Sequence, residues 1–258
     1  MTAIACHTEN HVATITIDRP AKRNALTQDM WEELSAKINS LGESGVTRAL
    51  ILTGEGAHFC AGADIAEFES TRRDAASARR YEASNISAFS ALRNAPFPAI
   101  AAISGVCFGG GFGLAAACDL RLADTTAKFC IPAARLGLAY PREAMIDIVT
   151  ALDPQTARRL AFTADILSVE EALSAGFVVS VETDRPVLDA ACALAGRIAR
   201  RAPLSVTASK AAILATIDSG QPLAKKARAF GDATFDSDDY AEGRAAFGEK
   251  RDPVFKGR

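Results

Sequence analysis

Two glycine-rich segments constrain this chain of 258 residues more than any other feature of its sequence. Residues 59–65 read FCAGADI, and residues 109–114 read GGGFGL. Glycine allows a backbone to approach its neighbours closely, and each segment leads into a helix-like run whose first N–H groups have no partner within the helix. A glycine triplet also serves as a packing or turn device. If the two sets of donors converge, they form an oxyanion hole, which holds the negative oxygen of an enolate or a tetrahedral intermediate.

The apolar pattern predicts a mixed α/β region over most of the chain. Short strands are expected at 11–17, 49–52, 99–103, 119–123, 128–131 and 178–181. Helices are expected to begin after Thr27, Asp153 and Ser168, which are capping residues ahead of helical periodicity. Residues 70–83 hold four arginines and few core positions. We therefore expect that segment to be mobile, whereas Ile86, Phe89 and Leu92 predict a helix in the second half of residues 64–94.

The two glycine-rich segments and both ends of the chain resemble the crotonase (enoyl-CoA hydratase/isomerase) superfamily. Residues 19–26, RPAKRNAL, resemble the family's segment beside coenzyme A, and residues 249–255, EKRDPVF, resemble its usual C-terminus. The resemblance implies an α/β fold with a ββα spiral core. It also implies that the backbone N–H groups of Ala63 and Gly110 hold the carbonyl oxygen of an acyl-CoA thioester. Coenzyme A would then be part of the substrate, and no separate cofactor is expected.

The segment that resembles the coenzyme A site contains two cations, Lys22 and Arg23. Such a pair is ordinarily exposed surface charge, whereas the resemblance places both beside the phosphates of coenzyme A. The other positions that the resemblance assigns to substrate binding are Ala25, Ala61, Asp64 and Ile65. We expect Asp64 to order the loop that presents the Ala63 N–H, to cap a short helix, or to do both.

Both catalytic carboxylates of the family's hydratases are missing from this chain. Those enzymes use two glutamates as a general acid/base pair that positions and activates water. One of the two positions matches Gly113, and the other matches Ala133, which follows Pro132. The resemblance therefore does not define the reaction as hydration, and slow or absent hydration is expected.

Tyr140 and Glu143 are the candidates that remain near the expected acyl pocket, within residues 136–143, LGLAYPRE. A tyrosine in this run resembles the methylmalonyl-CoA decarboxylase branch of the family. Decarboxylation of a malonyl-type thioester needs an oxyanion hole but no base, because loss of CO₂ itself generates the enolate. Two other readings stay open. Tyr140 could pack the loop while Glu143 favours the start of the next helix, or Glu143 could support isomerisation or hydration.

A helical region is expected to follow the core, which divides the chain into residues 1–202 and 203–258. The resemblance implies that the second part forms a trimer interface, giving a homotrimer or a dimer of trimers. It carries more apolar residues than a small appendage needs for itself. Those residues are Ile213, Leu214, Ile217, Phe230, Phe235 and Phe247. Packing of the same side chains onto the chain's own core is the alternative.

Composition excludes several classes of function. The formal net charge is −2 and basic residues are mixed with acidic ones, so neither nucleic acid nor an anionic membrane is an expected partner. Six cysteines without Cys-x-x-Cys spacing indicate reduced thiols, and three histidines without ligand spacing argue against a metal site. No apolar run is long enough to span a membrane and no secretory pattern is visible, so we expect a cytoplasmic protein.

The leading hypothesis is a lyase or isomerase of fatty acid metabolism that works through a thioester enolate. A non-catalytic acyl-CoA binder is the second hypothesis. A serine hydrolase of the distantly similar Clp protease fold is weaker, because no histidine is placed to serve as its base. A dinucleotide site is weaker still, since residues 109–113 lack the G-x-x-G ending of that motif.

Overall fold

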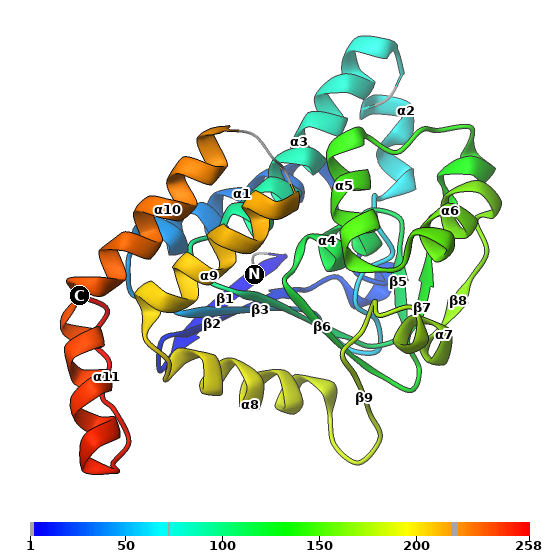
Figure 1. Cartoon of the computed structure of the whole chain (residues 1–258). Coiled ribbons are helices and arrows are strands. Elements are labelled where there is room, and N and C mark those ends of the chain that lie inside the picture. The colour runs from blue at the N-terminus through cyan, green and yellow to red at the C-terminus, as the bar shows by residue number, and fades with distance from the viewer. Residues whose placement is uncertain (1–2, 72, 218–220) are drawn as a thin grey trace.

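The computed structural model describes residues 3–71, 73–217 and 221–258 of the chain (Figure 1). A six-stranded sheet has the order β1-β2-β3-β4-β6-β9, and a three-stranded sheet has the order β5-β7-β8. The larger sheet contains β1 Ile4–Glu9, β2 Val12–Ile17, β3 Ala49–Gly54, β4 Ala99–Ile103, β6 Leu120–Asp124 and β9 Ser180–Glu182. The smaller one contains β5 Val106–Phe108, β7 Lys128–Cys130 and β8 Leu167–Ser168. From β2 to β9 the neighbouring strands of the larger sheet are parallel, which requires crossover connections between them.

Helices cover both faces of the larger sheet (Figure 1). The side that carries the candidate site has α1 Gln28–Glu43, α3 Ala75–Asn94 and α4 Gly110–Ala117, whose apolar residues share one core cluster with the sheet. On the opposite face α8 Val187–Ala199 packs on β3, β4 and β6 in a second cluster. The remaining helical segments of the core are η1 Pro20–Lys22, η2 Ile65–Glu67, α2 Phe68–Thr71, η3 Pro132–Leu136, α5 Arg142–Ala151, α6 Pro154–Thr163 and α7 Val169–Ser174.

Several local sequence signals act as predicted. Along β2, the alternating residues Ala13, Ile15 and Ile17 are fully buried, as expected for a strand with one face on the core. The Thr27 side chain accepts a hydrogen bond from the Met30 N–H and begins α1. Ser168 forms a reciprocal capping box with Glu171 and begins α7.

Other expectations differ from the structure. The helix expected in the second half of residues 64–94 begins a few residues earlier, because Asp74 and Ser77 form a capping box that starts α3 at Ala75. Residue 72 of the segment that we expected to be mobile lies outside the described residues. The strands β1, β5 and β8 were not predicted, and the last two are only three and two residues long.

The C-terminal part of the chain contains α9 Pro203–Ile217, α10 Gln221–Phe235 and α11 Asp238–Glu249, while residues 218–220 of the expected helical region lie outside the described residues. Figure 1 shows α9 and α10 side by side and α11 extending away from the core. The buried ammonium of Lys210 fastens α9 to the core, because its Nζ donates to the Asp119 carboxylate at 2.8 Å and to the Phe97 carbonyl at 3.0 Å. The division at residue 203 stays a prediction. Among the described helices, none combines the length and the apolarity needed to cross a bilayer.

Candidate active site

Three segments far apart in the sequence run side by side at the candidate site. The first and second are joined by hydrogen bonds from the Leu26 N–H to the Gly62 carbonyl at 2.8 Å and from the Asp64 N–H to the Leu26 carbonyl at 2.9 Å. The second and third are joined from the Cys60 N–H to the Val106 carbonyl and from the Phe108 N–H to the Cys60 carbonyl, both at 3.0 Å. Residues 60–64 therefore lie between the coenzyme A-like segment and the strand that leads into α4.

Glycine at position 62 permits a close approach to the second glycine-rich segment. Gly62 has a φ of +95°, which L side chains rarely adopt, and a Cβ added there would lie 2.8 Å from the Gly110 nitrogen. Gly109, at φ +53°, turns the chain into α4, and its N–H donates to the Cys130 carbonyl at 2.9 Å. The backbones of the two glycine-rich segments are thus in direct contact.

This contact brings the Ala63 and Gly110 backbones together. Gly110 is the first residue of α4, so its N–H has no acceptor within the helix. Ala63 stands opposite Leu26, and the pairing uses the Gly62 carbonyl and the Asp64 N–H rather than the N–H of Ala63. No backbone carbonyl among the described residues accepts a hydrogen bond from either N–H. The structure therefore leaves two neighbouring donors available, and their use in catalysis stays a prediction.

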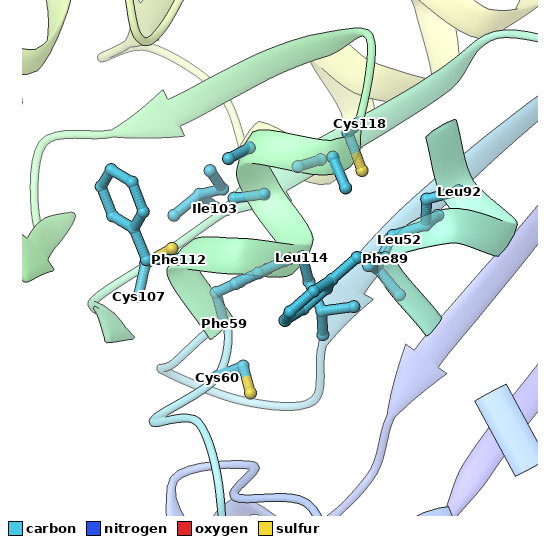
Figure 2. Close-up of a cluster of buried hydrophobic side chains, with 14 of the residues drawn as sticks. Leu52, Phe59, Cys60, Phe89, Leu92, Ile103, Cys107, Phe112, Leu114 and Cys118 are labelled. Carbon is cyan, nitrogen blue, oxygen red and sulfur yellow. The ribbon is translucent and has the colours of Figure 1, made fainter. Parts of the chain in front are cut away.

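Two buried aromatic rings fill the space beneath the first turn of α4. A Cβ added to Gly110 would lie 2.8 Å from the Trp31 ring, and one added to Gly113 would lie 2.7 Å from the Phe89 ring. Trp31 and Phe89 meet edge to face, with centroids 5.8 Å apart. In Figure 2 the Phe112 side chain projects from α4 itself, and Phe89 of α3 lies by another side of that helix. The sequence analysis did not identify these rings as part of the site, because only their contact with glycines far along the chain reveals it.

The two positions that carry glutamates in the hydratases are apolar here. The Phe89 ring reaches the space that a side chain at Gly113 would enter. Ala133, in η3, is 9% exposed and belongs to the main hydrophobic cluster. General acid/base chemistry by a carboxylate at either position is therefore not available to this chain.

Tyr140 points its hydroxyl into this apolar interior. Its oxygen is buried without a hydrogen-bond partner in the described part of the chain, and its ring packs against the main core cluster. Burial raises the pKa of the Tyr140 phenol strongly, and the thiols of Cys107 and Cys60 raise it further. Those two cysteines belong to the two segments that carry Gly110 and Ala63. Tyr140 is therefore a neutral donor that no acceptor satisfies among the described residues.

Glu143 lies in different surroundings from Tyr140, although only three residues separate them. It belongs to the first turn of α5, where a carboxylate favours the helix dipole. It also lines a cavity of about 910 Å³ between α5 and α9. Among the described residues that line this cavity, none is Ala63, Gly110 or Tyr140. The structure thus separates the two side chains that the sequence analysis considered together.

The coenzyme A-like segment is held by polar contacts that the sequence analysis missed. The Arg19 guanidinium donates to the Asp64 carboxylate at 3.0 Å and to the Ala25 carbonyl at 2.8 Å. Buried Asn24 accepts a hydrogen bond from the Arg19 N–H at 2.9 Å and holds the turn at a positive φ. The sequence contains both partners, a cation at Arg19 and an acid at Asp64. It does not indicate that they pair, because they are 45 positions apart and belong to different motifs.

Asp64 links this segment to the loop that presents Ala63. Its side chain accepts from the Ala66 N–H at 3.1 Å and so caps η2, as predicted. Burial alone would raise the pKa of the Asp64 carboxyl, but hydrogen bonds from Ala66 and Arg19 outweigh burial and lower it. Asp64 is therefore an ionised structural link at neutral pH.

The side chains expected to contact coenzyme A are mostly open to solvent. Lys22, Arg23 and Ile65 are exposed, with Ile65 at 65%, while Ala25 is buried and Ala61 half-buried. Two cations and an exposed aliphatic side chain at one surface suit phosphates and an adenine ring. Their roles in binding stay predictions.

The contact between Gly113 and Phe89 predicts a cost for any side chain at position 113. Gly113→Ala should lower the free energy of unfolding by about 1–3 kcal/mol, because the buried Phe89 ring has to move. Gly231→Ala is the matched control, since Gly231 is also within a helix but meets nothing within 4 Å, and it should raise stability by about 0.5–1 kcal/mol. Denaturant unfolding of both variants measures the difference. Equal effects of the two substitutions would contradict the contact.

Comparisons with known proteins agree on one family. Residues 7–258 match the family described as enoyl-CoA hydratase/isomerase. A crotonyl-CoA hydratase of Syntrophomonas wolfei is 34% identical over 250 residues, which cover 96% of this chain and 95% of that protein. A human mitochondrial Delta(3,5)-Delta(2,4)-dienoyl-CoA isomerase is 32% identical over 224 residues, which cover 81% of this chain and 67% of that protein. The crystal structure of an enoyl-CoA hydratase/carnithine racemase from Magnetospirillum magneticum superposes with a TM-score of 0.92 at 33% identity, covering 100% of this chain and 97% of the other. The predicted fold class is confirmed, and the chain belongs to the enoyl-CoA hydratase/isomerase, or crotonase, family.

Proposed function

We propose that this chain is an enzyme that binds an acyl-CoA thioester and stabilises its enolate with the backbone N–H groups of Ala63 and Gly110. The observation that carries the proposal is the contact of Gly62 with Gly110, which brings two unpaired donors to one place. Donors fixed before the reaction stabilise the charge that develops on the thioester oxygen without further reorganisation. Lys22 and Arg23 would bind the phosphates of coenzyme A at the exposed side of the same segment.

The oxyanion donors can be tested by removing one N–H. Ala63→Pro deletes this donor, whereas Ala63→Ser keeps the N–H and adds one polar atom. Loss of one donor should lower kcat by about 10²–10³-fold, and the serine variant should stay close to wild type. Turnover is measured on the best substrate from a panel of acyl-CoA esters, with products identified by mass spectrometry. A folded Ala63→Pro variant with wild-type kcat would overturn the proposal.

Gly110→Pro is a poorer test of the same idea. Proline would also delete the N–H, but its Cβ would lie about 2.8 Å from the Trp31 ring, so lost activity could reflect a disturbed core. Ala63 already carries a Cβ, and proline there adds only ring atoms on the side of the donor. The substitution at position 63 therefore separates lost donation from lost packing better.

The reaction we propose does not add water. Crotonyl-CoA hydratase is the printed name of one relative, but this chain has Gly113 and Ala133 where a hydratase needs its carboxylate pair. Acid/base catalysis contributes about 10²–10⁴-fold in typical enzymes, so hydration here should be slow or absent. A non-catalytic acyl-CoA binder remains the alternative, and the same substrate panel distinguishes it by binding without turnover.

Decarboxylation of a malonyl-type thioester is the second candidate, and the unsatisfied hydroxyl of Tyr140 favours it. Cleavage of the bond between Cα and the carboxylate releases CO₂ and leaves the electron pair as the enolate. Because Gly113 and Ala133 carry no charge, these positions do not repel the carboxylate of the substrate. Burial keeps the Tyr140 phenol protonated, so it can donate a hydrogen bond to that carboxylate. After CO₂ leaves, a water molecule bound to the hydroxyl could supply the proton to Cα, which leaves the phenol protonated.

This candidate makes a prediction for three proteins. Wild type should release CO₂ from methylmalonyl-CoA or ethylmalonyl-CoA, and Tyr140→Phe should do so about 10²-fold more slowly. Glu143→Gln should behave like wild type, because Glu143 lies in the cavity beside α9. The measurement is CO₂ release together with mass spectrometry of the thioester product. No release from wild type would end the decarboxylase candidate, and a large loss in Glu143→Gln would favour catalysis by Glu143.

We also propose that the helical region forms the contact between subunits of a homotrimer or a dimer of trimers. Its side chains include Ile213, Phe235 and Phe247, which are 62%, 66% and 88% exposed. Burial of apolar area is worth about 25 cal/mol per Å², so these side chains favour a protein partner.

Sedimentation velocity at micromolar concentration tests this assembly. The expected species are a trimer or a hexamer, and Phe247→Glu should shift the distribution toward smaller species because it places a charge at the contact. Leu173→Glu is the control, since Leu173 is 45% exposed on α7, outside the helical region. A wild-type monomer would contradict the proposal.

A further inference from the structure

A buried arginine lies at the end of α4 opposite to the candidate oxyanion hole. Arg121, on β6, is 7% exposed. Its guanidinium donates to the Cys118 carbonyl at 2.6 Å and to the Ala115 carbonyl at 3.2 Å, both in the C-terminal turn of α4. It also donates to the Phe177 carbonyl. The Cys118 carbonyl at the end of the helix thereby gains a donor, and the Ala115 carbonyl, which already accepts from the Cys118 N–H, gains a second one.

This cation has no carboxylate partner among the described residues. The nearest acid in sequence is Asp119, whose carboxylate binds the Lys210 ammonium at 2.8 Å and the Ala99 N–H at 2.7 Å. Arg121 instead lies over the face of the Phe177 ring, 5.3 Å from its centroid. A buried charge compensated only by carbonyl dipoles and a ring is costly to keep, so its position requires an explanation.

The dipole of α4 explains why a cation is placed there. α4 has eight residues, Gly110–Ala117, and none of them is charged. Its aligned peptide dipoles place partial positive charge at Gly110 and partial negative charge at the carbonyls that Arg121 binds. At 1.5 Å per residue the two ends are about 12 Å apart. A cation at the negative end cancels that end's unfavourable field and adds positive potential at the Gly110 N–H.

The same arginine also fixes where α4 sits. Phe177, which Arg121 contacts by a hydrogen bond and by its ring, stacks on Phe112 of α4 with centroids 4.5 Å apart. The carbonyl bonds hold one end of the helix to β6, and the Gly109 N–H holds the other end to the Cys130 carbonyl. The axial position of Gly110 therefore depends on both anchors.

We propose that Arg121 is a positioning residue, which holds α4 in place and strengthens the Gly110 N–H as a donor to the thioester oxygen. This rests on the proposed oxyanion hole. Because the charge on that oxygen grows only as the enolate forms, the contribution of Arg121 appears in kcat and in the polarisation of the bound carbonyl. Binding of coenzyme A, which contacts other segments, is left unchanged.

The carbonyl can be observed directly in bound butyryl-CoA with ¹³C at the thioester carbonyl. Isotope-edited difference infrared spectra compare wild type with Arg121→Gln, which removes the charge, and Arg121→Lys, which keeps it but makes fewer bonds. Arg93→Gln is the matched control. Its guanidinium is also largely buried, 2.7 Å from Asp147, but among the described residues its hydrogen bonds go to Ser90, Glu143 and Asp147 rather than to α4. Titration with coenzyme A and thermal unfolding accompany each protein.

Wild type should lower the carbonyl frequency on binding, Arg121→Gln should lose most of that shift, and Arg121→Lys should recover part of it. With methylmalonyl-CoA, kcat should fall about tenfold in Arg121→Gln, which corresponds to about 1.4 kcal/mol, while affinity for coenzyme A stays constant. Arg93→Gln should lose stability but keep the carbonyl shift. A wild-type shift in Arg121→Gln, or equal losses in Arg121→Gln and Arg93→Gln, would overturn the inference.

The infrared measurement also distinguishes failure of the proposed oxyanion hole from failure of the proposed role of Arg121. If wild type itself shows no carbonyl shift, the proposed oxyanion hole fails, whereas a shift that survives in the Arg121 variants removes only the role of Arg121. If Arg121→Gln does not fold, Arg121→Lys is compared with wild type alone. A smaller shift with unchanged affinity for coenzyme A then supports the inference, and an unchanged shift overturns it.

Discussion

The contact between the backbones of Gly62 and Gly110 is the constraint on which the rest of the site depends. A side chain at Gly62 would meet the Gly110 nitrogen at 2.8 Å, and one at Gly110 would meet Trp31 at the same distance. Residues 60–64 pair with the coenzyme A-like segment on one side and with β5 on the other, and the absence of side chains at Gly62 and Gly110 lets this layer reach α4 and lets α4 rest on Trp31. The N–H groups of Ala63 and Gly110 remain available as donors. The pairing of residues 60–64 does not use the first, and the second begins α4 and has no acceptor within the helix.

The sequence predicted those parts of the fold that local chemistry determines. The alternation in β2, the caps at Thr27 and Ser168 and the glycine-rich segments each describe their own surroundings, and the structure agrees with them. The strands β5 and β8 could not be predicted in the same way. They have three and two residues, and they exist because distant segments pair with them rather than because of their own composition.

The same limit applies within the candidate site. Asp64 was singled out from the sequence, but its partner Arg19 lies 45 positions earlier and only the fold brings them together. Tyr140 and Glu143 are close neighbours in the chain, yet α5 begins between them at Arg142 and carries Glu143 toward α9. Their proximity in sequence therefore suggested a common site, whereas Tyr140 packs against the main core cluster and Glu143 lines the cavity beside α9. The backbone donors were easier to predict, because glycine patterns report directly on where a backbone must fit closely.

Family membership and reaction are decided by different parts of this molecule. The proposed oxyanion hole is made of backbone N–H groups, and glycines keep side chains away from it, so it would tolerate changes in the surrounding side chains. The acid/base groups are side chains, and here their loss is coupled to packing, because Phe89 reaches the space next to Gly113 and rests on Trp31. A glutamate introduced at position 113 would meet that ring before it could hold water. Introducing the hydratase pair would therefore require a smaller residue at position 89 as well as two new carboxylates, which is a physical reason for proposing a reaction other than hydration in a chain with the family's fold.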